Sequence, residues 1–66
     1  MNKRKRTLSQ VEPMMLTIPD VAVKLGLGRT KVYNLIRDEG LPIVKFGTTT
    51  RVPIKELEQW ITRRIA

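Results

Sequence analysis

The sequence predicts a small, mostly helical α+β domain made of two short helices, a β-hairpin and a third helix. Apolar residues first recur with helical spacing in two stretches that glycines separate, then alternate as in β-strands, and finally return to helical spacing near the C-terminus. A chain of 66 residues has room for one such domain. Because a domain of this size buries only about 60% of its unfolded surface, its core is small.

The first predicted helix begins after Thr17, which is a suitable N-cap residue. Pro19 follows in the first turn and Asp20 stands at the third helical position, a variant of the capping box. Gly26 can adopt the left-handed conformation that ends a helix. The buried face is expected to comprise Val21, Ala22 and Leu25.

The second predicted helix runs from Arg29 to about Asp38. Gly28 is a permissible N-cap, Gly40 closes the helix, and Pro42 prevents its continuation. Asp38 and the residue after it are expected to mark a surface turn. The inner face is expected to comprise Val32, Leu35 and Ile36.

Residues 43–52 change to β spacing and predict a small hairpin. The β-prone residues 43–46 and 50–52 flank residues 47–49, which we expect to form the turn. Lys45 and Arg51 are expected to point outward together. The inner side is expected to comprise Val44, Phe46, Thr50 and Val52.

The third predicted helix covers residues 54–65 and starts after Pro53. Its inner stripe comprises Leu57, Trp60 and Ile61, with Arg64 as a further candidate. Acidic residues near its beginning and basic residues near its end suit the helix dipole. Trp60 is expected to fill the core rather than to serve as a stacking platform.

Residues 1–15 predict a flexible basic arm, and residues 16–66 predict the folded domain. Like charges repel one another at the start of the arm, and Pro13 discourages a helix. We expect the arm to steer the protein toward DNA without reading sequence, although minor-groove insertion or a role in solubility alone are the alternatives. The basic residues of the arm are Lys3, Arg4, Lys5 and Arg6.

Charge and composition narrow the function. Thirteen Lys and Arg against six Asp and Glu give a net charge of +7, which favours a polyanionic partner such as nucleic acid. The chain has no histidine, so it lacks the commonest general base and metal ligand, and it has no cysteine, so it lacks a thiol nucleophile. We expect no enzymatic activity, no metal, no cofactor and no small-molecule substrate.

The chain also lacks the apolar runs of a membrane protein. The longest uninterrupted apolar run is the three residues 14–16, and the basic N-terminus has no apolar stretch behind it that would make a signal peptide. We therefore expect a cytoplasmic protein that acts at the nucleoid and does not engage membranes.

Two helices joined by residues 26–28 and followed by a hairpin predict a winged helix-turn-helix. In this architecture the second helix enters the major groove of duplex DNA. Arg29 and Lys31 can pair with guanine, and Asn34 can pair with adenine. Thr30 can contact a thymine methyl group or a phosphate, whereas the alternative is a helix face that contacts only solvent. The candidate DNA-binding residues on this helix are Arg29, Thr30, Lys31, Tyr33, Asn34 and Arg37.

The hairpin is the second candidate DNA contact. Cations and hydroxyls on a protruding hairpin suit phosphate and minor-groove contacts, although a hairpin that only covers the core is the alternative. The candidate wing residues are Lys45, Thr48, Thr49 and Arg51. Tyr33 also suggests a nucleophile for strand cleavage, but a chain without histidine offers little to assemble such a site.

The order of these motifs resembles the excisionase and AlpA-like group of small DNA-binding proteins with MerR-like winged helix domains. The resemblance covers residues 16 to about 64 and rests on the stretches 16–22, 25–36, 40–42, 44–47, 51–52 and 57–61. It implies a recognition role for Arg29 to Arg37 and a wing role for Lys45 to Arg51. The sequence departs from the family pattern at Gly28, where serine or threonine is usual, and at Thr48 and Thr49, where wing tips are often arginine-rich.

Family members bind DNA beside recombination sites, bend it and help an integrase to reverse integration, while others regulate transcription. The resemblance therefore implies an architectural factor for site-specific recombination, with duplex DNA, an integrase and further copies of the protein bound cooperatively as partners. The alternatives are a small transcription regulator with the same domain, and a basic module that binds RNA or a protein.

Overall fold

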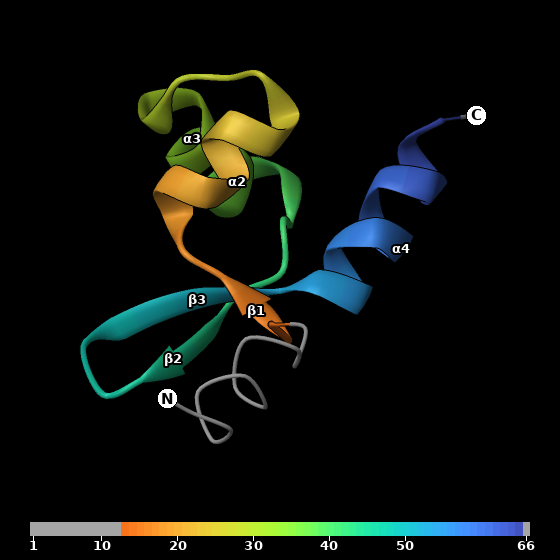
Figure 1. The fold of residues 1–66 in the computed structure, drawn as a ribbon. Coiled ribbons are helices and arrows are strands. Elements are labelled where there is room, and N and C mark those ends of the chain that lie inside the picture. Colours follow the sequence, from red (N-terminus) through yellow and green to blue (C-terminus); the bar gives the residue numbers. More distant parts are fainter. Residues whose placement is uncertain (1–12, 66) are drawn as a thin grey trace, which may run out of the picture.

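Six short elements follow one another in residues 13–65, the part of the chain that the computed structural model describes (Figure 1). The predicted arm residues Lys3, Arg4, Lys5 and Arg6 lie outside the described residues. The elements are β1 (Met15–Leu16), α2 (Ile18–Leu25), α3 (Arg29–Glu39), β2 (Val44–Phe46), β3 (Thr49–Pro53) and α4 (Ile54–Arg64). This order confirms the predicted α+β, mostly helical, winged helix-turn-helix class.

The ends of α2 and α3 lie where the caps predict. The Thr17 hydroxyl accepts a hydrogen bond from the Asp20 backbone N–H at 3.2 Å. Gly26 and Gly40 end the two helices with φ of 70° and 75°, the left-handed conformation that favours glycine. The second helix extends to Glu39, so Asp38 lies within its last turn and does not form a separate surface turn.

The sheet contains a strand that the sequence pattern did not reveal. Its order is β1-β3-β2, with Met15 opposite Pro53 and Leu16 opposite Val52. The Ile54 N–H extends this pairing by donating to the Met14 carbonyl at 3.0 Å. The expected boundary between arm and domain, after residue 15, therefore falls inside β1.

The register of the hairpin corrects the predicted faces. Val44 pairs with Arg51, and Phe46 pairs with Thr49. The turn therefore contains two residues rather than the expected three, and Gly47 at its first position has φ of 66°. A one-residue slip exchanges the two faces of a strand.

Paired residues share a face, so this register separates the two wing cations. Arg51 lies with Val44, Phe46 and Thr49, whereas Lys45 lies with Thr50 and Val52 on the opposite face. The prediction that Lys45 and Arg51 point outward together is wrong. The inner position predicted for Phe46 is also wrong, since its side chain is 56% exposed.

The core joins all three helices to β1 and β3. The buried residues are Leu16, Ile18, Val21, Ala22, Val32, Leu35, Leu41, Val52, Leu57 and Trp60. Partly buried side chains complete it: Leu25, Ile36, Ile54 and Ile61. The apolar inner faces predicted for the three helices are therefore confirmed, whereas Arg64 is exposed.

Helix α4 is joined to the end of α3 by two side chains, Trp60 and Arg64. The Trp60 indole Nε1 donates a hydrogen bond to the Glu39 carbonyl at 3.0 Å. The Arg64 guanidinium lies 4.5 Å from the centre of the Trp60 ring and pairs with Glu39 Oε1 at 3.3 Å. Figure 1 shows the resulting shape: α2 and α3 lie together above the sheet, while the hairpin and α4 extend to opposite sides.

Candidate nucleic-acid interface

Helix α3 carries the predicted recognition residues on its surface. Its core contacts come from Val32 and Leu35, which repeat at helical spacing on the inner face. The side chains of Arg29, Thr30 and Lys31 are exposed in the first turn. Farther along, Tyr33 and Arg37 are exposed and Asn34 is half-buried. The helix therefore presents cations, an amide, a phenol and a hydroxyl to a partner.

Three of the polar residues of α3 form a network that sequence reasoning missed. The Arg37 Nε donates to Asp38 Oδ1 and its Nη2 donates to Asp38 Oδ2, both at 3.0 Å. The same Nη2 donates to Asn34 Oδ1 at 3.0 Å. The hydrogen bond from Arg37 lowers the pKa of Asp38, and the same contact raises the pKa of Arg37.

This network orients two candidate DNA contacts before DNA arrives. The Asn34 amide oxygen faces Arg37, which leaves its NH₂ group for an acceptor on a base edge. The ion pair between Arg37 and Asp38 is solvent-exposed, so it contributes little to stability and can be exchanged for a phosphate contact. The three-residue spacing of Asn34 and Arg37 was a sequence signal for one part of this network, whereas the spacing of the adjacent residues Arg37 and Asp38 was not.

The hairpin presents a second polar surface. Lys45, Thr48 and Thr49 are exposed, and Arg51 is half-buried. The Arg51 Nη1 donates to the Thr50 carbonyl at 2.9 Å, which holds the guanidinium along the strand. Residues 43–53 contain two basic residues and no acidic residue, so the hairpin is uniformly positive.

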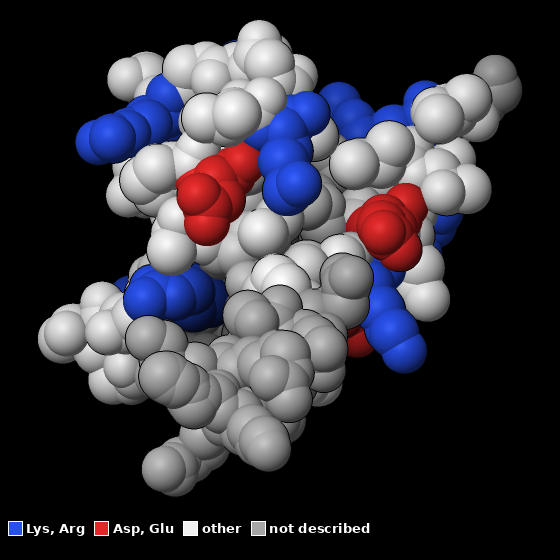
Figure 2. Space-filling model, in the orientation of Figure 1, with Lys and Arg blue, Asp and Glu red and all other residues white. Residues whose placement is uncertain are grey.

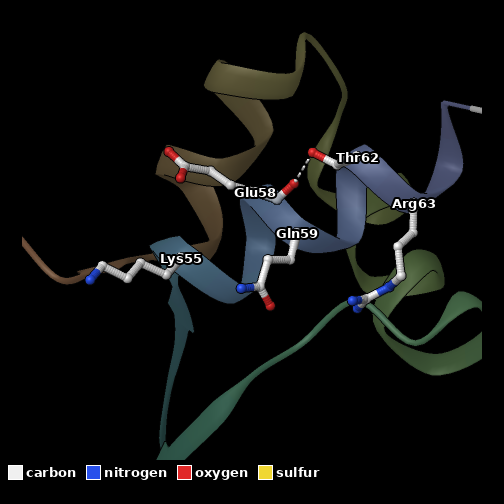
Figure 3. Close-up of a pocket in the computed structure, with 5 residues that line it drawn as sticks. All are labelled: Lys55, Glu58, Gln59, Thr62 and Arg63. Atoms are coloured by element: carbon white, nitrogen blue, oxygen red, sulfur yellow. Dashed lines mark hydrogen bonds between the residues drawn. The ribbon is translucent and has the colours of Figure 1, made fainter.

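Helix α4 carries a further hollow of the described surface. A shallow groove on α4 is lined by Lys55, Glu58, Gln59, Thr62 and Arg63. Figure 3 shows that these side chains fan outward rather than converge on a common point. The Thr62 hydroxyl donates to the Glu58 carbonyl at 2.9 Å, within the helix itself. Mixed charge and divergent groups do not define a ligand site.

Charge on the face shown in Figure 2 is distributed rather than gathered. Basic side chains lie at several separate places, and acidic groups interrupt them. Within residues 13–65, no group of three or more acidic, histidine or cysteine side chains could hold a metal ion. The described helices are also too short or too polar to span a membrane. The candidate nucleic-acid contacts are therefore the exposed polar side chains of α3 and the hairpin.

Gly28→Ser is expected to stabilise the protein by about 0.5–1 kcal/mol. Gly28 has φ −80° and ψ 164°, a conformation that serine adopts readily, and a Cβ there would meet no heavy atom within 4 Å. Gly28 makes no side-chain cap, whereas a serine hydroxyl can accept a hydrogen bond from the first turn of α3. Urea denaturation followed by far-UV circular dichroism measures the change.

Gly26→Ser is the matched control for this prediction. A Cβ at Gly26 would also meet no heavy atom within 4 Å, but φ is 70°. The control is expected to lose about 1 kcal/mol or more because L-residues are strained in this region. Equal effects of the two substitutions would show that backbone conformation does not distinguish the two glycines.

Comparison with known proteins places the chain in a family. A family model described as a helix-turn-helix domain matches residues 15–65. The excisionase of Streptomyces ambofaciens is 39% identical over 54 residues, which cover 82% of this chain and 87% of the relative. A probable excisionase of Saccharopolyspora erythraea is 36% identical over 53 residues, which cover 80% of this chain and 54% of the relative. No solved structure gives a significant match.

The matched region includes every described element from β1 to α4, so the family assignment applies to the whole winged domain. The resemblance inferred from the motifs is thereby confirmed. The chain belongs to the excisionase-like family of small helix-turn-helix DNA-binding proteins, which are not enzymes.

Proposed function

We propose that the protein is an architectural factor for site-specific recombination that binds and bends duplex DNA to assist an integrase. The observation that carries the proposal is the exposed polar and basic side chains of α3 together with a uniformly positive hairpin, on a domain whose relatives are named excisionases. In this proposal α3 reads the major groove, while the hairpin contacts phosphates and the minor groove. The protein acts on DNA in the cytoplasm.

The size of the chain favours an architectural role over a catalytic one. A chain of 66 residues without histidine or cysteine has few groups with which to cut or rejoin DNA. Its part in recombination is therefore to shape the duplex and to recruit an enzyme. Bending a site of 20–30 base pairs costs on the order of 1–6 kcal/mol.

One winged domain covers few base pairs, so several copies on adjacent sites share the cost of bending. Each copy adds phosphate contacts, and contacts between neighbours add free energy of binding. We therefore propose cooperative binding to direct repeats, with a bend that increases as the sites fill.

Circular-permutation gel shifts test this proposal. The binding site is first isolated by selection from random duplexes and located by footprinting in the DNA that flanks the gene. Probes then carry one, two or three copies of the site at different distances from their ends. The expected result is cooperative filling, with a mobility that depends on the position of the sites. Independent filling without any dependence on position contradicts the architectural role and favours a plain transcription regulator.

Preference for duplex DNA is tested in the same assay. A duplex RNA of the same sequence is expected to bind more weakly, because an α-helix does not enter the deep, narrow major groove of A-form RNA. Equal affinity for the two duplexes would favour an RNA-binding module instead.

A further inference from the structure

The aromatic residues are divided unequally between the core and the surface. The chain contains one Trp, one Tyr and one Phe. Trp60 is buried in the core, whereas Tyr33 and Phe46 are 54% and 56% exposed. Both exposed aromatic side chains lie on the elements proposed to contact DNA, Tyr33 on α3 and Phe46 on the hairpin.

Phe46 stands at the tip of the hairpin. It is the last residue of β2, and the two-residue turn Gly47-Thr48 separates it from its partner Thr49. Phe46 is absent from the apolar side chains that form the core or pack against it. Burying a phenylalanine side chain stabilises a folded protein, so exposure in the unbound protein forfeits a stabilising contribution. A surface role for the ring accounts for this placement.

The charges around Phe46 indicate which partner covers it. Residues 43–53 contain Lys45 and Arg51 and no acidic residue. A second hairpin of the same protein would bring like charges together, whereas a polyanion complements them. The exposed hydroxyls of Thr48 and Thr49 add hydrogen-bonding groups suited to phosphates.

The register places the two cations where a groove could be straddled. Lys45 and Arg51 lie on opposite faces of the hairpin, and Phe46, nearer the tip, shares the face of Arg51. The minor groove of B-DNA is about 6 Å wide and is bordered by two phosphate backbones. A hairpin tip directed into this groove brings one cation toward each backbone and the phenyl ring toward the base pairs.

We propose that Phe46 is a wedge that inserts between two adjacent base pairs from the minor groove and kinks the DNA there. Apolar side chains that enter the minor groove in this way partly unstack a base step and kink the duplex by about 20–90°. The inference deepens the proposed function and rests on it: the wedge supplies a bend at each copy, and neighbouring copies add their bends.

The experiment combines bending with a direct signal of unstacking. The probe is the duplex isolated by selection, with 2-aminopurine placed in turn at each adenine of the footprint, because its fluorescence rises when it loses its stacked neighbours. The wild-type protein is expected to raise the fluorescence severalfold at one step. Phe46→Ala is expected to abolish this rise and at least halve the bend angle measured on a single site.

Two further variants serve as controls for Phe46→Ala. Phe46→Leu retains an apolar side chain and is expected to preserve at least part of both the fluorescence rise and the bend. Ile65→Ala removes another exposed apolar side chain, 76% exposed, just beyond the end of α4, the helix that extends to the opposite side from the hairpin in Figure 1. It is expected to match the wild-type protein in both measurements.

Three results would overturn the wedge. The first is unchanged fluorescence and bending in Phe46→Ala. The second is a large fall in the melting temperature of Phe46→Ala, which would assign the ring to the core. The third is a wild-type dimer in the absence of DNA that Phe46→Ala converts to a monomer, which would assign the ring to a protein interface. Wild-type protein that binds DNA without bending it would instead contradict the proposed function.

Discussion

Trp60→Ala is expected to unfold most of the protein at room temperature. Replacing a buried tryptophan by alanine costs about 3–5 kcal/mol through lost burial and the cavity that remains. The substitution also leaves the Glu39 carbonyl without the indole N–H that it accepts in the native protein. A domain of 66 residues has a total stability of only about 3–10 kcal/mol, so the loss removes much or all of it.

Far-UV circular dichroism during urea denaturation measures this loss without relying on tryptophan fluorescence. Trp60→Phe is the control, because it keeps an aromatic ring and removes the N–H; it is expected to lose about 1–2 kcal/mol. Arg64→Ala removes the guanidinium from the ring and is expected to lose less than about 1 kcal/mol. A Trp60→Ala protein that stays folded and binds DNA would refute its role as the closing residue of the core.

Arg29→Ala is expected to remove discrimination at one base position of the binding site. Arg29 is exposed at the first residue of α3 and makes no ion pair with the described residues. Its guanidinium is therefore available for a bidentate contact with guanine O6 and N7, which is worth about 1–3 kcal/mol of discrimination. The loss corresponds to roughly 5- to 150-fold in relative affinity at that position.

Lys45→Ala is the comparison for Arg29→Ala. Phosphates carry no sequence information, so the loss of a hairpin lysine is expected to weaken all duplexes by a similar factor. Affinities for a panel of single-base variants of the selected site separate the two patterns. A uniform loss of affinity in both variants would show that α3 does not supply the sequence-specific contacts and the hairpin the nonspecific ones.

The parts of the fold that depend on neighbouring residues could be predicted from the sequence. The hydroxyl of Thr17 and the left-handed glycines Gly26 and Gly40 act within one turn of their own helices. The inner faces of the helices follow from the helical spacing of the apolar residues, and this spacing can be recognised within each helix. These signals are local, so they can be recognised without knowledge of the tertiary structure.

The parts that depend on distant pairing could not be predicted in the same way. β1 has only two residues and exists because β3, more than thirty residues later, supplies its hydrogen bonds. The faces of the hairpin depended on whether the turn held two or three residues, and Gly47 is compatible with both. The number of residues in the turn therefore decides which of the two wing cations lies on the same face as Phe46.

The candidate site shows the same limit. Its residues could be chosen from the sequence because the side chains of a helix that do not face the core face the solvent. The hydrogen bonds from Arg37 to Asp38 and Asn34 depend on the conformations of these side chains. The spacing of residues along a helix shows which side chains can meet but not whether they do.

The join between β3 and α4 has a mechanical consequence. Pro53 is both the last residue of the strand and the N-cap of the helix, so no loop separates the hairpin from α4. At the far end of this path, Trp60 is hydrogen-bonded to Glu39, the last residue of α3. The hairpin and α3, the two elements proposed to contact DNA, are therefore linked through α4 by the chain at Pro53 and by the hydrogen bond of Trp60. If both elements hold one duplex, as proposed, this link restricts their relative movement, so we expect the DNA to bend to fit their spacing.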